Sequence, residues 1–188
     1  LENVGYMGLE RDGGFAGFVT VPAGNAARIE SALTDVELAS FPCAYGTAEN
    51  LLTRANVVQG EVVLVTGASG GVGSAVVQLA RLRGARVIAV TTREKAHDVL
   101  ALGAQQTVER SANLVHALGR DSVDVVVDVV GGDAFTGLLD VLKRGGRYAV
   151  AGAIAGPVVP LDLRTLYLKD LSLLGCTVTT PAVFRRLV

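Results

Sequence analysis

A glycine-rich segment between a predicted strand and a predicted helix carries the clearest chemical signal in the sequence. It reads Thr66-Gly67-Ala68-Ser69-Gly70-Gly71-Val72-Gly73. In such a turn one glycine permits the bend out of the strand, another lets the backbone approach a pyrophosphate, and a third lets the helix pack on the strand. Free N–H groups of the first helical turn then face the phosphates, aided by the helix dipole. The segment predicts a dinucleotide-binding site formed by Gly67, Ser69, Gly70, Gly71, Val72 and Gly73.

The residues at the end of the next predicted strand indicate which dinucleotide binds. A site selective for NAD(H) usually has Asp or Glu here, which binds the 2′-hydroxyl of the adenosine ribose. Thr91 stands in that place and is followed by Thr92, Arg93 and Lys95. Hydroxyls and positive charges suit a 2′-phosphate, which a carboxylate would repel, so NADP(H) is favoured over NAD(H). The alternative is that Arg93 and Lys95 are solvated charges at a helix start, and Glu94 reduces the positive charge of the segment.

Two further predicted strands end in small residues. One ends at Val130 and Gly131, and the other ends just before Gly152 and Ala153. The carboxyl ends of parallel strands lie at the edge of the sheet where ligands bind. Small residues there would let a flat nicotinamide ring approach the backbone, so we expect these four residues to contact the cofactor. An ordinary connection between strand and loop is the alternative for each pair.

The elements that would position these residues alternate in type from about residue 51 onward. Short apolar runs rich in Val and Ile predict strands at residues 62–66, 86–90, 123–130, 148–151 and 171–176. Helices are expected between them, at residues 73–83, 94–102, 112–118 and 134–143. Continuous apolar strands are typical of a parallel sheet that is covered on both faces. The pattern predicts an α/β fold with a doubly wound parallel sheet of the Rossmann type.

The first part of the chain has a different pattern. Residues 16–21 form a β-like run ended by Pro22, and residues 25–38 show no strong periodicity. We therefore expect residues 1–40 to be the end of another, mostly β domain and residues 41–188 to be the dinucleotide-binding domain. The chain starts at Leu1 rather than Met and shows no signal-peptide pattern. We expect it to be a piece of a longer protein.

Composition argues against several classes of function. The 188 residues carry a net charge of −1, and 50% of them are hydrophobic, which is enough for a substantial core. Charges of both signs are spread along the chain, so we expect no nucleic-acid partner, and no apolar run is long enough to span a membrane. The two cysteines, Cys43 and Cys176, lie far apart. This fits a reducing compartment, and we expect a cytoplasmic location.

Five segments together resemble the medium-chain dehydrogenase/reductase superfamily, in particular its quinone-oxidoreductase-like branch of zinc-binding dehydrogenases. They are residues 12–16, residues 42–48, the glycine segment, residues 125–132 and residues 145–152. The resemblance extends from about residue 12 to residue 176, with Gly17 where family members often have Glu. The short-chain dehydrogenase pattern fits less well, because it needs a Tyr-x-x-x-Lys pair. Lys does not stand four positions after any of the tyrosines, which are Tyr6, Tyr45, Tyr148 and Tyr167.

The resemblance implies roles for several residues before the glycine segment. Residues 1–40 would be a remnant of a β-rich, GroES-like catalytic domain, and Thr47 would lie near the nicotinamide. Cys43 matches the position of a zinc ligand in zinc-dependent members. We expect no metal, since a catalytic zinc site needs about three protein ligands, and we favour a buried structural thiol for Cys43. Cys176 is expected in the core or in an interface. Tyr45 is a weak candidate for the catalytic acid, and a packing role suits it equally.

These features imply an oxidoreductase that transfers hydride between NADP(H) and a carbonyl or an activated double bond of a small molecule, as quinone and enone reductases do. This chain would supply the cofactor domain. The alternatives are a zinc-dependent alcohol dehydrogenase, a non-catalytic cofactor-binding or interaction module, and a reductase domain of a larger synthase. The apolar edge strand near Leu171 to Thr177 predicts a homodimer, because a bare strand of this kind would promote aggregation.

Overall fold

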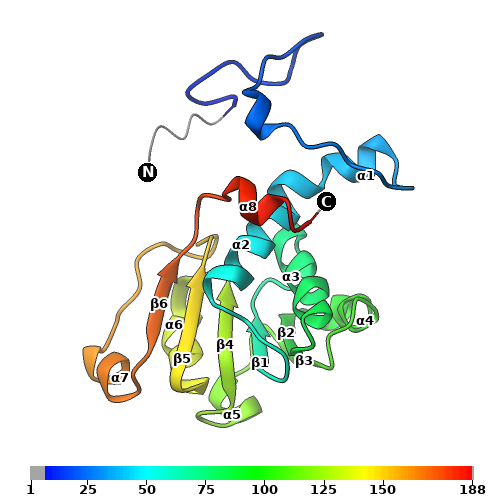
Figure 1. The fold of residues 1–188 in the computed structure, drawn as a ribbon. Helices are drawn as coiled ribbons and strands as arrows, with labels where there is room; N and C mark the ends of the chain where they lie inside the picture. The colour runs from blue at the N-terminus through cyan, green and yellow to red at the C-terminus, as the bar shows by residue number, and fades with distance from the viewer. Residues whose placement is uncertain (1–6, 188) are drawn as a thin grey trace.

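The computed structural model describes residues 7–187, which contain a parallel sheet with helices on both faces (Figure 1). The six strands follow the order β3-β2-β1-β4-β5-β6, and all neighbours run parallel. They are β1 (Val62–Val65), β2 (Arg86–Thr91), β3 (Gln106–Glu109), β4 (Val123–Asp128), β5 (Leu142–Val150) and β6 (Ser172–Gly175). The order reverses between β1 and β4, and doubly wound sheets bind ligands at this switch point.

The helices cover the sheet in two sets. One face carries α2 (Gly46–Arg54), α3 (Gly71–Leu82) and α4 (Ala96–Ala101), and the other carries α5 (Leu114–Leu118), α6 (Phe135–Val141) and α7 (Leu163–Leu168). Helix α1 (Asp35–Ala39) precedes them, and α8 (Pro181–Phe184) contacts α2. Shorter helical turns occupy Ala23–Asn25, Phe41–Tyr45, Arg93–Lys95 and Gly132–Ala134. Within residues 7–187, no helix is both long and apolar enough to cross a membrane.

Strand β1 shows why both faces of the sheet must be covered. Val63 and Val65 lie in the buried cluster formed with α2 and α3, whereas Val62 and Leu64 lie in the cluster formed with α5 and α6. Successive side chains of a strand point to opposite faces, so four consecutive apolar residues need a packing layer on each side. The predicted doubly wound fold is confirmed.

Each of the five strands expected from apolar runs is present, with shifts at the ends. Strand β3 was not expected, because three of its four residues are polar and only Val108 is buried. It is an edge strand, which needs little apolar surface. The helix expected over residues 134–143 ends at Val141, since Leu142 already pairs with Val123 as the start of β5.

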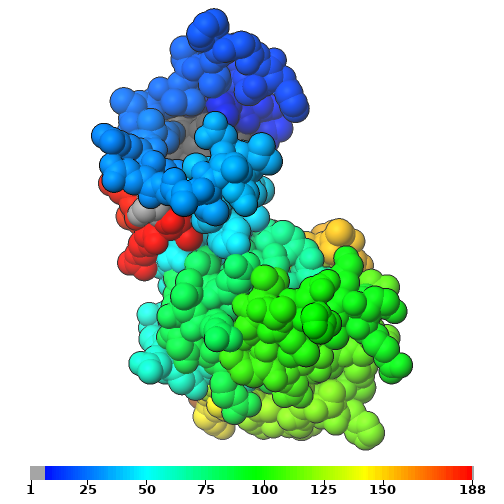
Figure 2. Space-filling model, turned by 90° about the vertical axis from the view of Figure 1, so that its right-hand side faces the viewer, coloured from blue at the N-terminus to red at the C-terminus, as the bar shows by residue number. Residues whose placement is uncertain are grey.

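The β-like run expected at residues 16–21 is wrong, because these residues form no strand. Phe15 and Phe18 are fully exposed. A strand needs a neighbour that pairs its backbone and covers its apolar side chains, and within residues 7–187 none pairs with this segment. Figure 2 shows the N-terminal segment, coloured blue, as a lobe that projects from the body of the molecule.

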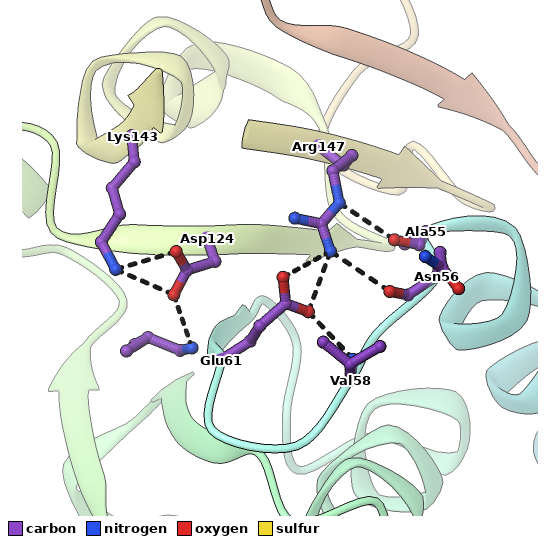
Figure 3. Close-up of polar contacts among 8 residues, drawn as sticks. Ala55, Asn56, Val58, Glu61, Asp124, Lys143 and Arg147 are labelled. Carbon is purple, nitrogen blue, oxygen red and sulfur yellow. Dashed lines mark hydrogen bonds and ion pairs between the residues drawn. The ribbon is translucent and has the colours of Figure 1, made fainter. Parts of the chain in front are cut away.

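Arg147 joins three parts of the chain near the amino ends of the central strands (Figure 3). Its guanidinium donates to the Glu61 carboxylate at 2.8 and 2.9 Å, to the Ala55 carbonyl at 3.0 Å and to the Asn56 carbonyl at 3.3 Å. Glu61 also accepts a hydrogen bond from Val58 N at 3.0 Å. Arg147 thereby fastens β5 to the end of α2 and to the turn before β1.

Asp124 makes a second set of polar contacts at this edge (Figure 3). Its carboxylate accepts hydrogen bonds from Lys143 Nζ at 2.8 and 2.9 Å and from Val62 N at 2.8 Å. Burial opposes ionisation of Asp124, but these hydrogen bonds and the charges of Lys143 and Arg147 outweigh it and lower the pKa of the carboxyl. The ionised Asp124 side chain therefore links β4 to β1 and β5.

We predict that Asp124→Asn makes the free energy of unfolding less dependent on pH in the acidic range. A lowered folded-state pKa contributes stability above the unfolded-state value, and this contribution is lost as the pH falls through the folded-state value. Between about pH 5 and about pH 2, the free energy of unfolding should fall more steeply for the wild type than for the variant. Urea unfolding at several pH values measures both slopes. The exposed Asp98→Asn variant is the control, and equal slopes for wild type and Asp124→Asn would contradict the prediction.

Candidate cofactor-binding site

The turn from β1 into α3 depends on a close backbone contact. Gly67 has a positive φ of 56°. Gly73 packs so tightly on it that a Cβ at position 73 would lie 2.7 Å from the Gly67 carbonyl carbon and closer still to its oxygen. Position 73 therefore accepts only glycine, and this brings the start of α3 directly onto the end of β1, as the sequence predicts.

The N-terminus of α3 is open at this turn. Gly70 is the N-cap and offers no side chain to cap the helix, and Gly70 and Gly71 are exposed. The N–H of Ser74 donates to the Gly70 carbonyl at 2.8 Å, so the N–H groups of Gly71, Val72 and Gly73 precede the helical hydrogen bonds. A 12-residue helix with a bare first turn attracts anions through these groups and its dipole.

A cavity of about 850 Å³ lies beside this turn, at the carboxyl ends of β1, β2, β3 and β4. Its volume is in the range of cofactor and small-molecule sites. Residues from three of the expected segments line it, and they are Gly67, Ser69, Thr91, Thr92, Val130 and Gly131. The structure therefore brings the ends of β1, β2 and β4 together around one cavity.

The remaining expected residues lie outside the wall of this cavity. Gly152 and Ala153 line a neighbouring cavity of about 240 Å³, which shares Gly131 with the larger one. Arg93 and Lys95 are exposed on the short helix after β2. The others lie at the starts of helices, with Gly70, Gly71, Val72 and Gly73 at α3 and Thr47 at α2.

Thr91 and Arg110 both line the large cavity. The Thr91 side chain is buried, and its hydroxyl has no hydrogen-bond partner among the described residues. Such a hydroxyl costs free energy unless a ligand or water satisfies it. Arg110 follows β3, and its backbone N–H donates to the Thr91 carbonyl at 2.9 Å.

The charge of Arg110 reaches the loop that follows β2. Hydrogen bonding to the Thr92 side chain is the main cause that lowers the pKa of Glu94, and the positive charge of Arg110 adds to it. Arg110 was not expected at the site, because β3, the strand that it follows, was not expected. An edge strand with Val108 as its apolar residue would have placed Arg110 at the carboxyl edge beside Thr91.

Asp128 is a second residue that sequence analysis did not single out. It ends β4, and its side chain is fully buried. It accepts hydrogen bonds from the Thr66 and Tyr148 hydroxyls and from the N–H groups of Val130, at 2.8 Å, and Gly131, at 3.1 and 3.2 Å. Burial and the Asp128 carboxylate raise the pKa of the Tyr148 phenol, which therefore stays a donor. The sequence signal that could have identified Asp128 is a carboxylate at the end of an apolar run.

Tyr45 and Cys43 lie on the π-helical turn Phe41–Tyr45 before α2. The Tyr45 ring stacks on Phe41, with centroids 4.3 Å apart, and its hydroxyl accepts a hydrogen bond from Gln78 Nε2 at 3.0 Å. Cys43 is exposed, so the expected buried structural thiol is wrong. The turn packs Phe41 and Tyr45 inward and leaves Cys43 outside. Cys176 is buried in the core, as expected.

The family resemblance raises the question of a zinc ion. Within residues 7–187, no group of three or more His, Cys, Asp and Glu side chains is arranged to hold a metal. A catalytic zinc site needs about three protein ligands, and Cys43 brings a single exposed thiol. His97 and His116 lie on α4 and α5, which cover opposite faces of the sheet. These residues do not fit a zinc site.

Comparison with known proteins identifies the family. Residues 71–188 match the family model described as zinc-binding dehydrogenase. The chain is 36% identical to the acryloyl-coenzyme A reductase of Metallosphaera sedula, in a match that covers 88% of this chain and 50% of that protein. The chain thus spans about half the length of the curated relatives it matches.

Two solved structures share the fold. A protein of Sinorhizobium meliloti 1021, provisionally assigned as an alcohol dehydrogenase, is 53% identical with a TM-score of 0.90, over 97% of this chain and 52% of that chain. The quinone oxidoreductase of Thermus thermophilus, solved also with NADPH, is 35% identical with a TM-score of 0.74, over 88% and 56% of the two chains. Together with the fold, these matches show that the chain belongs to the zinc-binding dehydrogenase family of the medium-chain dehydrogenase/reductase superfamily.

Proposed function

We propose that the protein is an NADP(H)-dependent oxidoreductase in which this chain supplies the cofactor-binding domain. The substrate is a small molecule with a carbonyl or an activated double bond. One observation carries the proposal. The cavity at the carboxyl edge of the sheet lies beside the bare N-terminus of α3 and is lined by Thr91 and Arg110. The exposed thiol of Cys43 suits a reducing compartment such as the cytoplasm.

The start of α3 suits the pyrophosphate. Its first-turn N–H groups and the helix dipole provide positive potential without any charged side chain. Ser69 lines the cavity and adds a hydroxyl donor. This part of the site binds any dinucleotide, so it does not select between NADP(H) and NAD(H).

The preference for NADP(H) rests on the groups around Thr91. No carboxylate ends β2, so no negative charge at this strand end repels a 2′-phosphate. The charged residues of this region are Arg93, Lys95, Arg110, Glu94 and Glu109, so cations exceed carboxylates. Arg110 lines the cavity itself, which makes it the best placed of the cations. The NADPH complex of the Thermus thermophilus relative supports this assignment.

When bound, nicotinamide supplies the hydride chemistry. The chain's own residues bind and orient it. Gly131, Gly152 and Ala153 line the smaller cavity at the ends of β4 and β5, where we place the nicotinamide ring. The names of the relatives, acryloyl-coenzyme A reductase and quinone oxidoreductase, favour a conjugated hydride acceptor.

The edge of the sheet formed by β6 supports a proposed homodimer. β6 lies at the edge of the sheet and pairs with β5 on one side only. Exposed apolar side chains flank it, including Leu173 on β6 and Leu163, Tyr167 and Leu168 on α7. A bare apolar edge strand would promote aggregation, and pairing with β6 of a second copy would cover it.

We predict that Arg110→Gln weakens NADPH binding about tenfold, because a charge-assisted contact to the 2′-phosphate is lost. NADH affinity should not change, since NADH has no 2′-phosphate. The chain contains no Trp, so the fluorescence of the reduced cofactors reports their binding without interference from Trp. Arg120→Gln, at an exposed position paired with Asp140, is the matched control. Equal or tighter binding of NADH by the wild type would overturn the preference for NADP(H).

We predict that Leu173→Lys converts a wild-type dimer into a monomer, because a charge on an edge strand opposes strand pairing. Light scattering at micromolar concentration measures the mass of each. Leu82→Lys, on the exposed side of α3 away from β6, should leave the dimer intact. A monomeric wild type would refute the proposed dimer.

A further inference from the structure

Asp128 joins three strands at the edge where the cavity lies. The Thr66 hydroxyl that it binds follows β1, the Tyr148 hydroxyl belongs to β5, and Asp128 itself ends β4. The N–H groups of Val130 and Gly131 belong to the turn after β4. One carboxylate thus holds the end of its own strand, both neighbouring strands and the following turn.

The 129–131 turn, which Asp128 holds, forms part of the cavity wall. Val130 and Gly131 line the cavity. Gly131 has a φ of 66°, and a Cβ there would lie 2.8 Å from the Gly156 carbonyl oxygen. A Cβ on Gly67 would lie 3.1 Å from Val129 Cγ2 and 3.2 Å from Val130 Cγ2. The turn therefore fits tightly between the glycine turn and the loop after β5, and a small displacement of it reshapes the cavity.

Every partner of Asp128 is a donor. The two backbone N–H groups cannot change this role, and Tyr148 and Thr66 direct their hydroxyls at the carboxylate. The Asp128→Asn substitution would replace one carboxylate oxygen with an N–H₂ group. This group is itself a donor, and it would face other donors. Because the side chain is fully buried, water cannot make up for the lost contacts.

We propose that Asp128 is a positioning residue for the nicotinamide half of the cofactor. Asp128 lies at the cavity wall with its side chain fully buried, and it acts through the 129–131 turn. In a doubly wound fold the end of β2 binds the adenosine ribose, so the β4 and β5 side of the switch point faces the nicotinamide half. This inference rests on the proposed NADP(H) site and adds a residue whose effect is confined to one half of it.

Calorimetry on the 188-residue chain and on its Asp128→Asn variant, with two probes, tests the two halves of the cofactor site separately. NADPH occupies the whole site, whereas 2′,5′-ADP occupies the adenosine half only. We expect the Kd for NADPH to rise about tenfold and the Kd for 2′,5′-ADP to change less than about twofold. Tyr148→Phe removes one donor and leaves the carboxylate in place, so it should raise the NADPH Kd about threefold with the same selectivity.

Asp124→Asn is the matched control, because it changes a carboxylate at the other end of β4. It should affect stability and leave both Kd values unchanged. If Asp128 only supports the fold, Asp128→Asn will weaken both probes equally or neither, and the inference fails. If Asp128→Asn does not fold, the ratio of the two Kd values for Tyr148→Phe decides in the same way. A wild type that binds 2′,5′-ADP and NADPH while the variants bind both unchanged overturns this inference alone. A wild type that binds neither probe overturns the proposed function with it.

Discussion

The contact between Gly73 and the Gly67 carbonyl is the constraint on which the rest of the site depends. It leaves no room for a Cβ and so sets how closely α3 approaches β1. That approach places the bare first turn of α3 at the carboxyl edge of the sheet, next to the ends of β2 and β4. A wider turn would keep the helix but move its free N–H groups away from the cavity. The proposed anion binding is therefore a consequence of backbone packing.

Polar side chains hold the two ends of the central strands, and apolar packing fills the middle. Arg147 and Asp124 bind at the amino ends, and Asp128 binds at the carboxyl end. Apolar packing is not directional, whereas hydrogen bonds to carboxylates and carbonyls require defined positions. The apolar faces therefore supply cohesion, and these side chains favour one alignment of β1, β4 and β5. At the carboxyl end this alignment shapes the cavity.

The sequence predicts those parts of the fold that local patterns encode. Apolar runs locate buried strands such as β1, and the glycine turn locates the proposed phosphate site. Edge strands carry little apolar signal, so β3 was missed and Arg110 with it. The exposed side of a turn depends on its packing, which is why Cys43 was misplaced. For residues 16–21 the error is the opposite one, a strand that was expected but does not form. An apolar run forms a strand only beside another strand. The role of Asp128 could not be predicted from the sequence, because its hydroxyl partners lie on or next to other strands.

The proposed site divides into a part formed by backbone and a part formed by side chains. This division affects how its preference between NADP(H) and NAD(H) can change. The N–H groups at α3 remain whatever side chains surround them, and substitution at Gly73 would disrupt the fold. Thr92, Arg93 and Lys95 lie on a surface segment that includes the short helix after β2, and Arg110 is exposed at the end of an edge strand. None of these four supports a buried core, so they can change at little cost in stability. Affinity for the dinucleotide is thus tied to the fold, while the choice of its 2′-substituent is free to vary.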